Sequence, residues 1–190
     1  MDQPAPEITK ETKLLSIDVE SNGLHGEAFA VGAVLMNAKG EVLDEFIGRC
    51  PVVGKIDPWV KDNVIKPMKD VPEDYPNAKK MRDAFWSWYL PAKNQADYVL
   101  ADNGYPVEAR FLIQCQDDDI EDRYWGHPFP LLDLASMLLQ VGIKPLAVRK
   151  KMVEDKMGGA PSLHHNPRWD AQVSALAAFE AWKLSGQLKS

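Results

Sequence analysis

Blocks of apolar and polar residues predict three strands at the start of the chain. In the first block, Ile17 and Val19 are apolar and their neighbours at 18 and 20 are polar, which is the alternation of a strand. Two further apolar runs follow, and the Asn-Ala-Lys-Gly sequence at 37–40 between them is typical of a hairpin turn. The three predicted strands cover residues 13–20, 28–36 and 42–49, and they open the fold as an antiparallel unit.

Helical and strand patterns alternate in the rest of the chain. Met81 and Phe85 recur at helical spacing, and Pro91 is expected to end their helix. Residues 51–76 contain five prolines and few periodic apolar residues, so we expect a surface loop with one short helix near residues 59–65. The later predicted elements are a helix over 77–89, a strand over 97–102, a helix over 106–114, a strand over 130–133, a helix over 134–141 and a helix from about 169 to 184.

This order of elements predicts the fold class and the domain organisation. An antiparallel start followed by alternating helices and strands favours one mixed sheet with helices on its faces, an α/β layered domain. The 190 residues fit one such domain, which we expect to cover residues 13–190. Residues 1–12 are polar and contain two prolines, so we expect a disordered lead there. No apolar run approaches the roughly 20 residues of a membrane span, and the N-terminus lacks an apolar signal region.

Composition and charge narrow the class of protein. Hydrophobic residues make up 45% and charged residues 26% of the chain, which is near the average for a globular protein. The two cysteines, Cys50 and Cys115, stand alone, which excludes a disulfide framework or a Cys-x-x-Cys zinc pair and predicts a reducing, cytoplasmic setting. The net charge of -6 argues against broad binding to long nucleic acid. A short or end-bound nucleic acid is compatible with it, since bound cations cancel carboxylate charge locally.

The first predicted strand carries two acidic side chains on one face. Asp18 and Glu20 are two residues apart, so both point to the same side of the strand. Acidic residues are depleted in strands and costly when buried without a partner, so a central strand that carries two of them requires a compensating cation. The alternative is an edge strand whose acids are solvated. Asp18-Val19-Glu20 by itself leaves both interpretations open.

A second group of candidate residues lies directly before the last predicted helix. His165 precedes Asp170 by five residues. Helix starts favour Asp for capping and dipole reasons, so Asp170 also has a purely structural interpretation. The adjacent His164 and His165 can likewise be an exposed loop pair. The combination with Asp18 and Glu20 favours a functional site.

Together the two groups resemble motifs one and three of the DEDDh exonuclease family, which includes proofreading subunits of DNA polymerases, ribonuclease T and oligoribonuclease. Residues 18–24, Asp-Val-Glu-Ser-Asn-Gly-Leu, are similar to motif one. Residues 165–170 are similar to motif three, with the family's spacing from histidine to aspartate. The likeness covers roughly residues 14–182 and implies a ribonuclease H-like mixed sheet, in agreement with the strand pattern.

Motif two departs from the family pattern. The family usually has an Asn after a strand and then an aromatic-Asp pair at a helix start, followed by an apolar pair. Here the sequence from Asn103 to Leu112 places Glu108 where the aspartate is expected. Asp102, at the end of the preceding strand, is the competing candidate. Glu108 ranks first because it aligns without a gap and Pro106 suits a helix start. Capping of a turn by Asp102 and a helix-dipole role for Glu108 are the structural alternatives.

The resemblance implies a metal-dependent reaction. Phosphodiester hydrolysis needs a strong nucleophile and stabilisation of charge on both oxygens, which two divalent cations about 4 Å apart supply. Four carboxylates without cysteine ligands suit Mg²⁺ or Mn²⁺ and not zinc. By resemblance, Asp18 bridges the two cations and Glu20 and Asp170 complete the first site. Glu108 or Asp102 holds the second.

The resemblance also assigns a base and substrate contacts. His165 becomes the general base, a task that suits a pKa near neutrality, with His164 as the less favoured choice. The implied substrate-binding residues are Ser21, Asn22, Gly23, Leu24 and Asn103, with main-chain contacts at Ser21 and Asn22 and an apolar wedge at Leu24. Tyr105 and Trp169 can stack on bases or belong to the core. The basic residues that can meet phosphates, or form a solvated loop, are Lys144, Arg149, Lys150, Lys151, Lys156 and Arg168.

The sequence therefore predicts a 3′ to 5′ exonuclease that acts on single-stranded or short DNA or RNA with a free 3′ end. One alternative is a binding module that keeps the fold without efficient catalysis. Another is a phosphodiesterase for small nucleotides or dinucleotides. Several members of the family pair as dimers, so a homodimer is among the expected assemblies.

Overall fold

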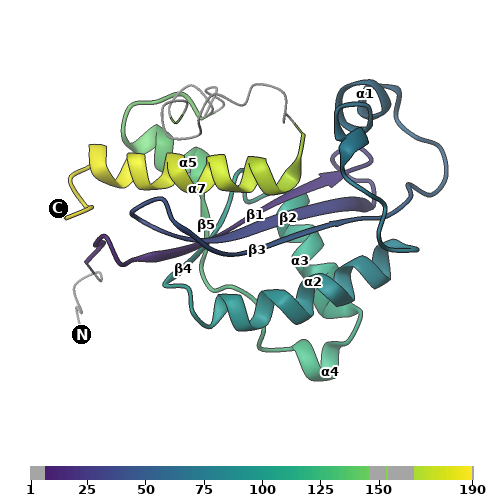
Figure 1. Ribbon diagram of the computed structural model, residues 1–190, viewed down its shortest axis with the longest axis horizontal. Helices are drawn as coiled ribbons and strands as arrows, with labels where there is room; N and C mark the ends of the chain where they lie inside the picture. The colour runs from purple at the N-terminus through teal and green to yellow at the C-terminus, as the bar shows by residue number, and fades with distance from the viewer. Residues whose placement is uncertain (1–6, 146–152, 154–164, 190) are drawn as a thin grey trace.

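The computed structural model describes residues 7–145, 153 and 165–189 and contains a five-stranded sheet in the order β3-β2-β1-β4-β5. The central strand β1 (Lys13–Ser21) pairs antiparallel with β2 (Ala28–Asn37) and parallel with β4 (Tyr98–Ala101). The outer strands are β3 (Val42–Arg49) and β5 (Leu131–Asp133). Figure 1 shows β1 running through the middle of the sheet, so the solvated edge strand is excluded.

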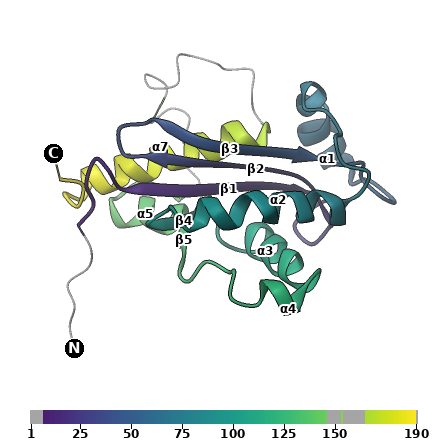
Figure 2. The same ribbon diagram turned by 60° about the horizontal axis from the view of Figure 1, so that its bottom comes forward.

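Helices cover both faces of the sheet, as Figure 2 shows with the strands nearly side-on. On one face lie α2 (Ala78–Lys93) and α3 (Val107–Asp117), with the short α4 (Ile120–Arg123) at the end of α3. On the other face lie α5 (Leu134–Gln140) and the long α7 (Pro167–Leu184). The predicted fold class, a mixed sheet flanked by helices, is confirmed.

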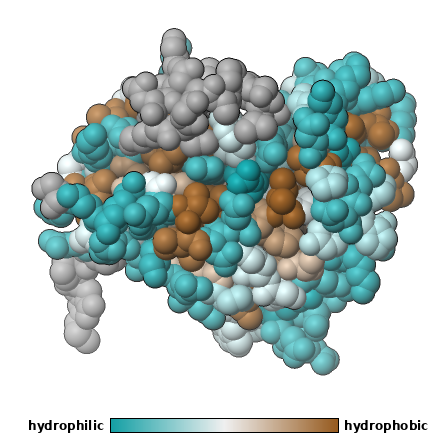
Figure 3. All heavy atoms as spheres, viewed as in Figure 1, coloured by the Kyte–Doolittle hydropathy of each residue, from teal (hydrophilic) through white to brown (hydrophobic). Residues whose placement is uncertain are grey.

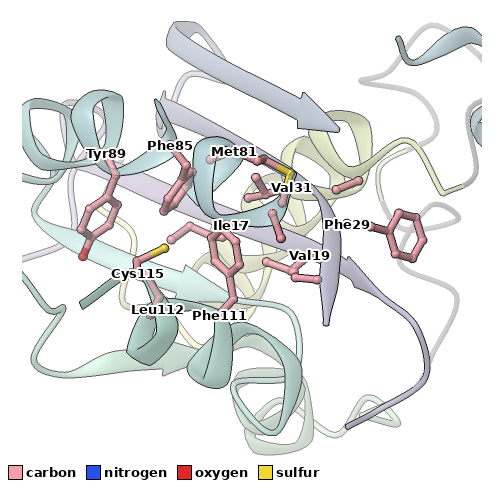
Figure 4. Close-up of a cluster of buried hydrophobic side chains, with 14 of the residues drawn as sticks. Ile17, Val19, Phe29, Val31, Met81, Phe85, Tyr89, Phe111, Leu112 and Cys115 are labelled. Atoms are coloured by element: carbon pink, nitrogen blue, oxygen red, sulfur yellow. The ribbon is translucent and has the colours of Figure 1, made fainter. Parts of the chain in front are cut away.

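Each face of the sheet has its own hydrophobic core. Ile17 and Val19 of β1 pack with Phe85 of α2 and Phe111 of α3, and all four side chains are buried (Figure 4). Leu14 of β1 belongs to the second core, which is built largely on α7. Because side chains alternate along a strand, Asp18 and Glu20 lie on the same side as Leu14, facing α7. The strand thus contributes to a core on each face, and its acids lie on the α7 side beyond Leu14.

The predicted elements are present, with shifted ends. Helix α2 continues through Pro91, whereas the sequence predicted that Pro91 ends it. A proline lacks a backbone donor and its ring crowds the preceding turn, yet the helix passes through Pro91 and buries the next residue, Ala92. The last helix begins at Pro167, ahead of the predicted start at 169, because Asn166 caps it by accepting from the Trp169 amide at 3.2 Å.

Residues 51–76 wrap the end of the sheet as three short helical pieces, α1 (Pro58–Val60), η1 (Lys61–Ile65) and η2 (Pro67–Asp70). Arg49 at the end of β3 fixes the last of them. Its guanidinium donates to the carbonyl oxygens of Met68 at 2.8 Å and Val71 at 2.9 Å. The predicted short helix near 59–65 is therefore present as α1 and η1.

The described part of the predicted lead is packed against the C-terminus. Ile8 is buried and forms a backbone bridge with Leu188. Ordered packing thus begins before Lys13. None of the helices among the described residues is long and apolar enough to cross a membrane. On the face shown in Figure 3, apolar residues form separate patches divided by hydrophilic ones.

Candidate active site

The acidic end of β1 projects beyond its parallel neighbour. The pairing with β4 ends at Ile17 opposite Ala101, while the pairing with β2 continues as far as Ser21. Asp18 and Glu20 therefore lie where the sheet is open on one side. In open α/β sheets, ligands bind at the carboxyl ends of the strands, which is where these two acids lie.

The start of α7 delivers a third carboxylate to this point. Asp170 lies in the first turn of α7. Asp18 pairs in register with Gly32 of β2, and a Cβ added to Gly32 would overlap the backbone of Pro167 and Arg168. The absence of a side chain at Gly32 allows the helix start to contact the sheet directly. This close approach places Asp170 beside Asp18.

Asp18, Glu20 and Asp170 form a compact acidic cluster. Each offers one carboxylate oxygen, and the three oxygens lie within 4.8 Å of one another. Burial raises the pKa of Asp18 well above its usual value, and the charges of Asp170 and Glu20 raise it further. Burial, followed by the charge of Glu20, raises the pKa of Asp170 to about 7. An oxygen-only, mutually repelling set of this kind fits a hard divalent cation such as Mg²⁺ or Mn²⁺.

His165 stands at the edge of the cluster. Its Nδ1 lies 3.2 Å from Oε1 of Glu20, and the hydrogen bond with Glu20 raises the pKa of the imidazole although burial opposes this. The backbone of His165 has φ of 61°, the only positive value among the described residues other than glycine. Such a conformation is costly for a side chain with a Cβ and is found at functional sites. His164 lies outside the described residues.

Two further acids border the cluster on the β4 side. Glu108, in the first turn of α3, is 7% exposed, and burial raises its pKa to about 7. Asp102 follows β4. Its carboxylate accepts hydrogen bonds from the Ser174 hydroxyl of α7 at 3.2 Å and from the side-chain amide of Asn103 at 3.1 Å. The charges of both acids raise the pKa of Asp18, and the effect of Glu108 is larger than that of Asp102. Neither has an oxygen within the three-carboxylate cluster itself.

Beside the cluster lies a pocket of about 300 Å³. One wall consists of the end of β1 and the turn after it, including Glu20, Ser21 and Leu24. The opposite wall consists of the α1 region, including Trp59 and Val60. Leu24 and Trp59 are 65% and 61% exposed, so apolar surface is available on both walls. Val107 closes the pocket next to Glu108.

The structure places the remaining predicted residues in the pocket wall, in the core or at the surface. Ser21 and Gly23 belong to the pocket wall, where the Ser21 hydroxyl donates to the Gly23 carbonyl at 2.8 Å. Trp169 is 4% exposed and therefore belongs to the core, while Tyr105 is 81% exposed near the motif-two acids. Arg168 pairs with Glu45 at 2.7 Å. Lys144 is exposed, and Arg149, Lys150, Lys151 and Lys156 lie outside the described residues.

Sequence reasoning missed the α1 wall of the pocket. The available signal was Asp57-Pro58, a capping residue followed by a proline at the first helical position. Asp57 does cap α1, accepting from the Trp59 amide at 2.8 Å and the Val60 amide at 3.3 Å. That signal predicts a helix start, but not that the helix faces the acidic end of β1.

Comparison with solved structures shows that this chain has a known fold. No family model matches the chain, and no curated protein matches its sequence. Exonuclease X, solved in complex with 5′ overhanging duplex DNA, is 17% identical with a TM-score of 0.56 and covers 91% of this chain and 93% of its own. This chain has the same fold. The nuclease domain of 3′hExo, a DEDDh family member solved with rAMP, is also 17% identical, with a TM-score of 0.52 and coverage of 93% and 94%.

These matches confirm two sequence-based predictions. The ribonuclease H-like fold is present over nearly the whole chain, and the resemblance to DEDDh exonucleases holds at the level of the fold. The roles of individual residues are a separate question, which the acidic cluster, His165 and the pocket address.

Proposed function

We propose that the protein is a metal-dependent 3′ to 5′ exonuclease that removes mononucleotides from the end of single-stranded or short DNA or RNA. The observation that carries the proposal is the meeting of Asp18 and Glu20 of β1 with Asp170 of α7, within 4.8 Å of one another and beside a pocket. The fold shared with two exonucleases supports it. Clustered acids with raised pKa values in a cleft are typical of catalytic sites.

In this proposal the carboxylates of Asp18, Glu20 and Asp170 hold one divalent cation, and Glu108 or Asp102 contributes to a second. When bound, such cations activate a water molecule and stabilise the charge on the leaving oxygen. Asp18, whose pKa is raised by burial and by the charges of Asp170 and Glu20, would contribute to both sites.

His165 acts as the general base. The contact of its Nδ1 with Glu20 orients the ring and leaves Nε2 to accept the proton of the attacking water. The side chain is 35% exposed, so the proton can pass on to solvent. The hydrogen bond with Glu20 is the main cause of the raised pKa of His165, and a cation bound by Glu20 would weaken this effect.

The pocket next to Glu20 receives the terminal nucleoside. Leu24 and Trp59 contact the two faces of the base, since stacking on aromatic and apolar side chains is the common way to hold an unpaired base. Backbone groups of Ser21 and Asn22 and the turn at Gly23 contact the sugar, and Asn103 approaches from the end of β4.

The test is cleavage of 5′-labelled single-stranded DNA and RNA oligonucleotides with Mg²⁺ or Mn²⁺, with EDTA as a control. We expect a ladder that shortens from the 3′ end. Asp18→Ala should abolish it, a loss on the order of a thousandfold or more, while the circular dichroism spectrum is unchanged. A ladder from the 5′ end, or full activity of folded Asp18→Ala, would refute the proposal.

The size of the pocket favours one enzymatic alternative, a phosphodiesterase for dinucleotides. A volume of about 300 Å³ accommodates a single nucleoside and gives no reason to require a long strand. Rapid cleavage of dinucleotides with none of longer strands would select this alternative. Binding of oligonucleotide ends without cleavage would select the binding module.

We also propose a cytoplasmic setting and a homodimer, as expected from the sequence. Both cysteines are free and buried, as suits a reducing compartment. The mass measured by light scattering tests the dimer against a chain mass of 21.3 kDa.

A further inference from the structure

A single side chain ties the turn after β1 to the opposite wall of the pocket. Nδ2 of Asn22 donates to the Lys55 carbonyl oxygen at 3.0 Å, and Oδ1 of Asn22 accepts from the Asp57 backbone amide at 2.9 Å. Both polar groups of the side-chain amide are therefore engaged by residues 55–57. Across the described chain, no other hydrogen bond joins residues 21–25 to residues 55–60.

The connection continues through Asp57 into the wall. The Asp57 carboxylate accepts from the backbone amides of Trp59 and Val60 at 2.8 and 3.3 Å and so caps α1. Trp59 and Val60 both line the pocket. A short path of hydrogen bonds therefore leads from the strand that carries Glu20, through Asn22 and Asp57, to the residues that face Glu20 across the pocket.

Trp59 depends on this path more than its neighbours do. Val60 and Val64 are buried and hold their side of the segment by packing. Trp59 is 61% exposed and lies in the first turn of the helical run that α1 and η1 form together, so little packing holds its side chain. The Arg49 contacts that secure this segment lie at its far end, at Met68 and Val71.

We propose that Asn22 is a positioning residue, which sets the distance between Leu24 and Trp59 and thereby how tightly the pocket holds the terminal nucleoside. The inference rests on the proposed function. Without the Asn22 side chain, the 55–60 segment moves away from the turn and the pocket loosens. The pairing of β1 with β2 still holds the carboxylates, so the loss falls on substrate binding and little on the chemical step.

The first measurement is the binding of nucleoside 5′-monophosphates by calorimetry in Mn²⁺. We expect Asn22→Ala to weaken binding about tenfold, equivalent to about 1.4 kcal/mol. KM for oligonucleotides should rise by a similar factor while kcat stays within about twofold.

The matched control is Asn63→Ala. It removes a hydrogen bond to the Trp59 carbonyl in the same segment without touching the turn, and should change binding less than about twofold. Unchanged binding by Asn22→Ala would refute the proposal.

A double-mutant cycle tests whether Asn22 acts through Trp59. In a Trp59→Ala background, Asn22→Ala should weaken binding by less than about twofold, because the wall that it positions is already lost. Independent, multiplicative effects of the two substitutions would contradict the positioning role.

Hydrogen exchange of the backbone amides separates this inference from the proposed function, because it needs neither activity nor ligand. In Asn22→Ala, the Trp59 and Val60 amides should exchange faster, with the Asn63→Ala protein as reference. Unchanged exchange would refute the link from Asn22 to α1 whatever the activity. A different outcome is that the two amides exchange faster in Asn22→Ala but the wild type binds no nucleotide. This outcome would refute the proposed function, and with it the nucleotide-binding role of Asn22.

Discussion

At the scale of single residues, the acidic site stores unfavourable free energy. Asp18, Asp170 and Glu108 have raised pKa values, chiefly because burial penalises their charged forms, and His165 adopts a positive φ. Such costs persist only where the surrounding structure enforces them. The β1–β2 pairing and the direct contact of α7 with Gly32 supply that enforcement. A bound cation would remove much of the repulsion.

This electrostatic strain predicts the pH dependence of stability without metal. A carboxyl whose pKa is higher in the folded than in the unfolded state costs nothing below the unfolded value, near 4, and destabilises the fold increasingly as pH rises to about 7. Asp18→Asn removes one of these charges. We expect Asp18→Asn to be more stable than the wild type by at least about 1 kcal/mol at neutral pH, or about 2–4 °C in Tm.

Thermal unfolding in EDTA measures the effect, and the gain should shrink towards about pH 4. Mn²⁺ should raise Tm of the wild type and leave that of Asp18→Asn nearly unchanged. A variant that is less stable than the wild type at neutral pH would contradict the raised pKa of Asp18.

The two motif-two candidates differ in their contacts, and this predicts different effects. Asp102 accepts hydrogen bonds from Ser174 and Asn103, and Ser174 lies one turn after Asp170 on α7. Asp102 is thus engaged in holding the helix that carries Asp170. We expect Glu108→Gln to lower kcat more than about a hundredfold and Asp102→Asn about tenfold, the range for residues that orient metal ligands.

Mn²⁺ titration of both variants by calorimetry supplies a second measurement besides activity. The reverse ranking would make Asp102 the ligand and Glu108 a structural acid. If both variants kept near-wild-type activity, the second cation site would have to lie elsewhere.

At the scale of elements, the decisive contact is that of α7 with β2. The backbone of Pro167 and Arg168 occupies the space that a side chain at Gly32 would need, directly opposite Asp18 in the register. Small shifts of this helix start therefore displace Asp170 from Asp18 and Glu20. The geometry of the cluster depends on one glycine that carries no functional group.

Gly32→Ala should therefore weaken the site through geometry alone. We expect Mn²⁺ affinity and kcat to fall by about 10–100-fold, as for loss of a residue that orients ligands, with the folded state retained. The control is Gly104→Ala, whose added Cβ makes only an ordinary contact, 3.7 Å from Cβ of Asp133. Wild-type Mn²⁺ affinity in folded Gly32→Ala would show that α7 can dock without this close approach.

Much of the architecture was predictable because its signals are local. The apolar runs of β1 to β3, the acids at 18 and 20 and the helix start before Asp170 are all visible in sequence patterns. The α1 wall was not predictable, because its contact with the turn after β1 is a hydrogen bond from the Asp57 backbone amide to Asn22, 35 positions away in the sequence. The predicted end of α2 was wrong, because the helix continues through Pro91 to Lys93 and buries Ala92.

At the scale of the whole molecule, charge limits how the protein meets a nucleic acid. The net charge is -6, and Arg168, beside the site, is paired with Glu45. In the proposed function the pocket receives one nucleoside, so we expect few phosphates to be neutralised. For one to three such contacts, log K should fall against log salt with a slope of about -1 to -2.

Fluorescence anisotropy of a labelled oligonucleotide in Ca²⁺, at several salt concentrations, measures this slope. KM should also become independent of strand length beyond a few nucleotides. A slope steeper than about -4 would show an extended basic track, to which the residues of the 149–156 segment would have to contribute.

The candidate active site joins residues that are far apart in the sequence and are therefore synthesised at different times. Glu20 leaves the ribosome 145 residues before His165, which lies just before α7. Because α7 also builds most of one hydrophobic core, a chain that does not yet include α7 lacks that core as well as the third carboxylate. Under the proposed function, a chain whose synthesis has not yet reached Asp170 therefore lacks the complete acidic cluster that cleavage requires.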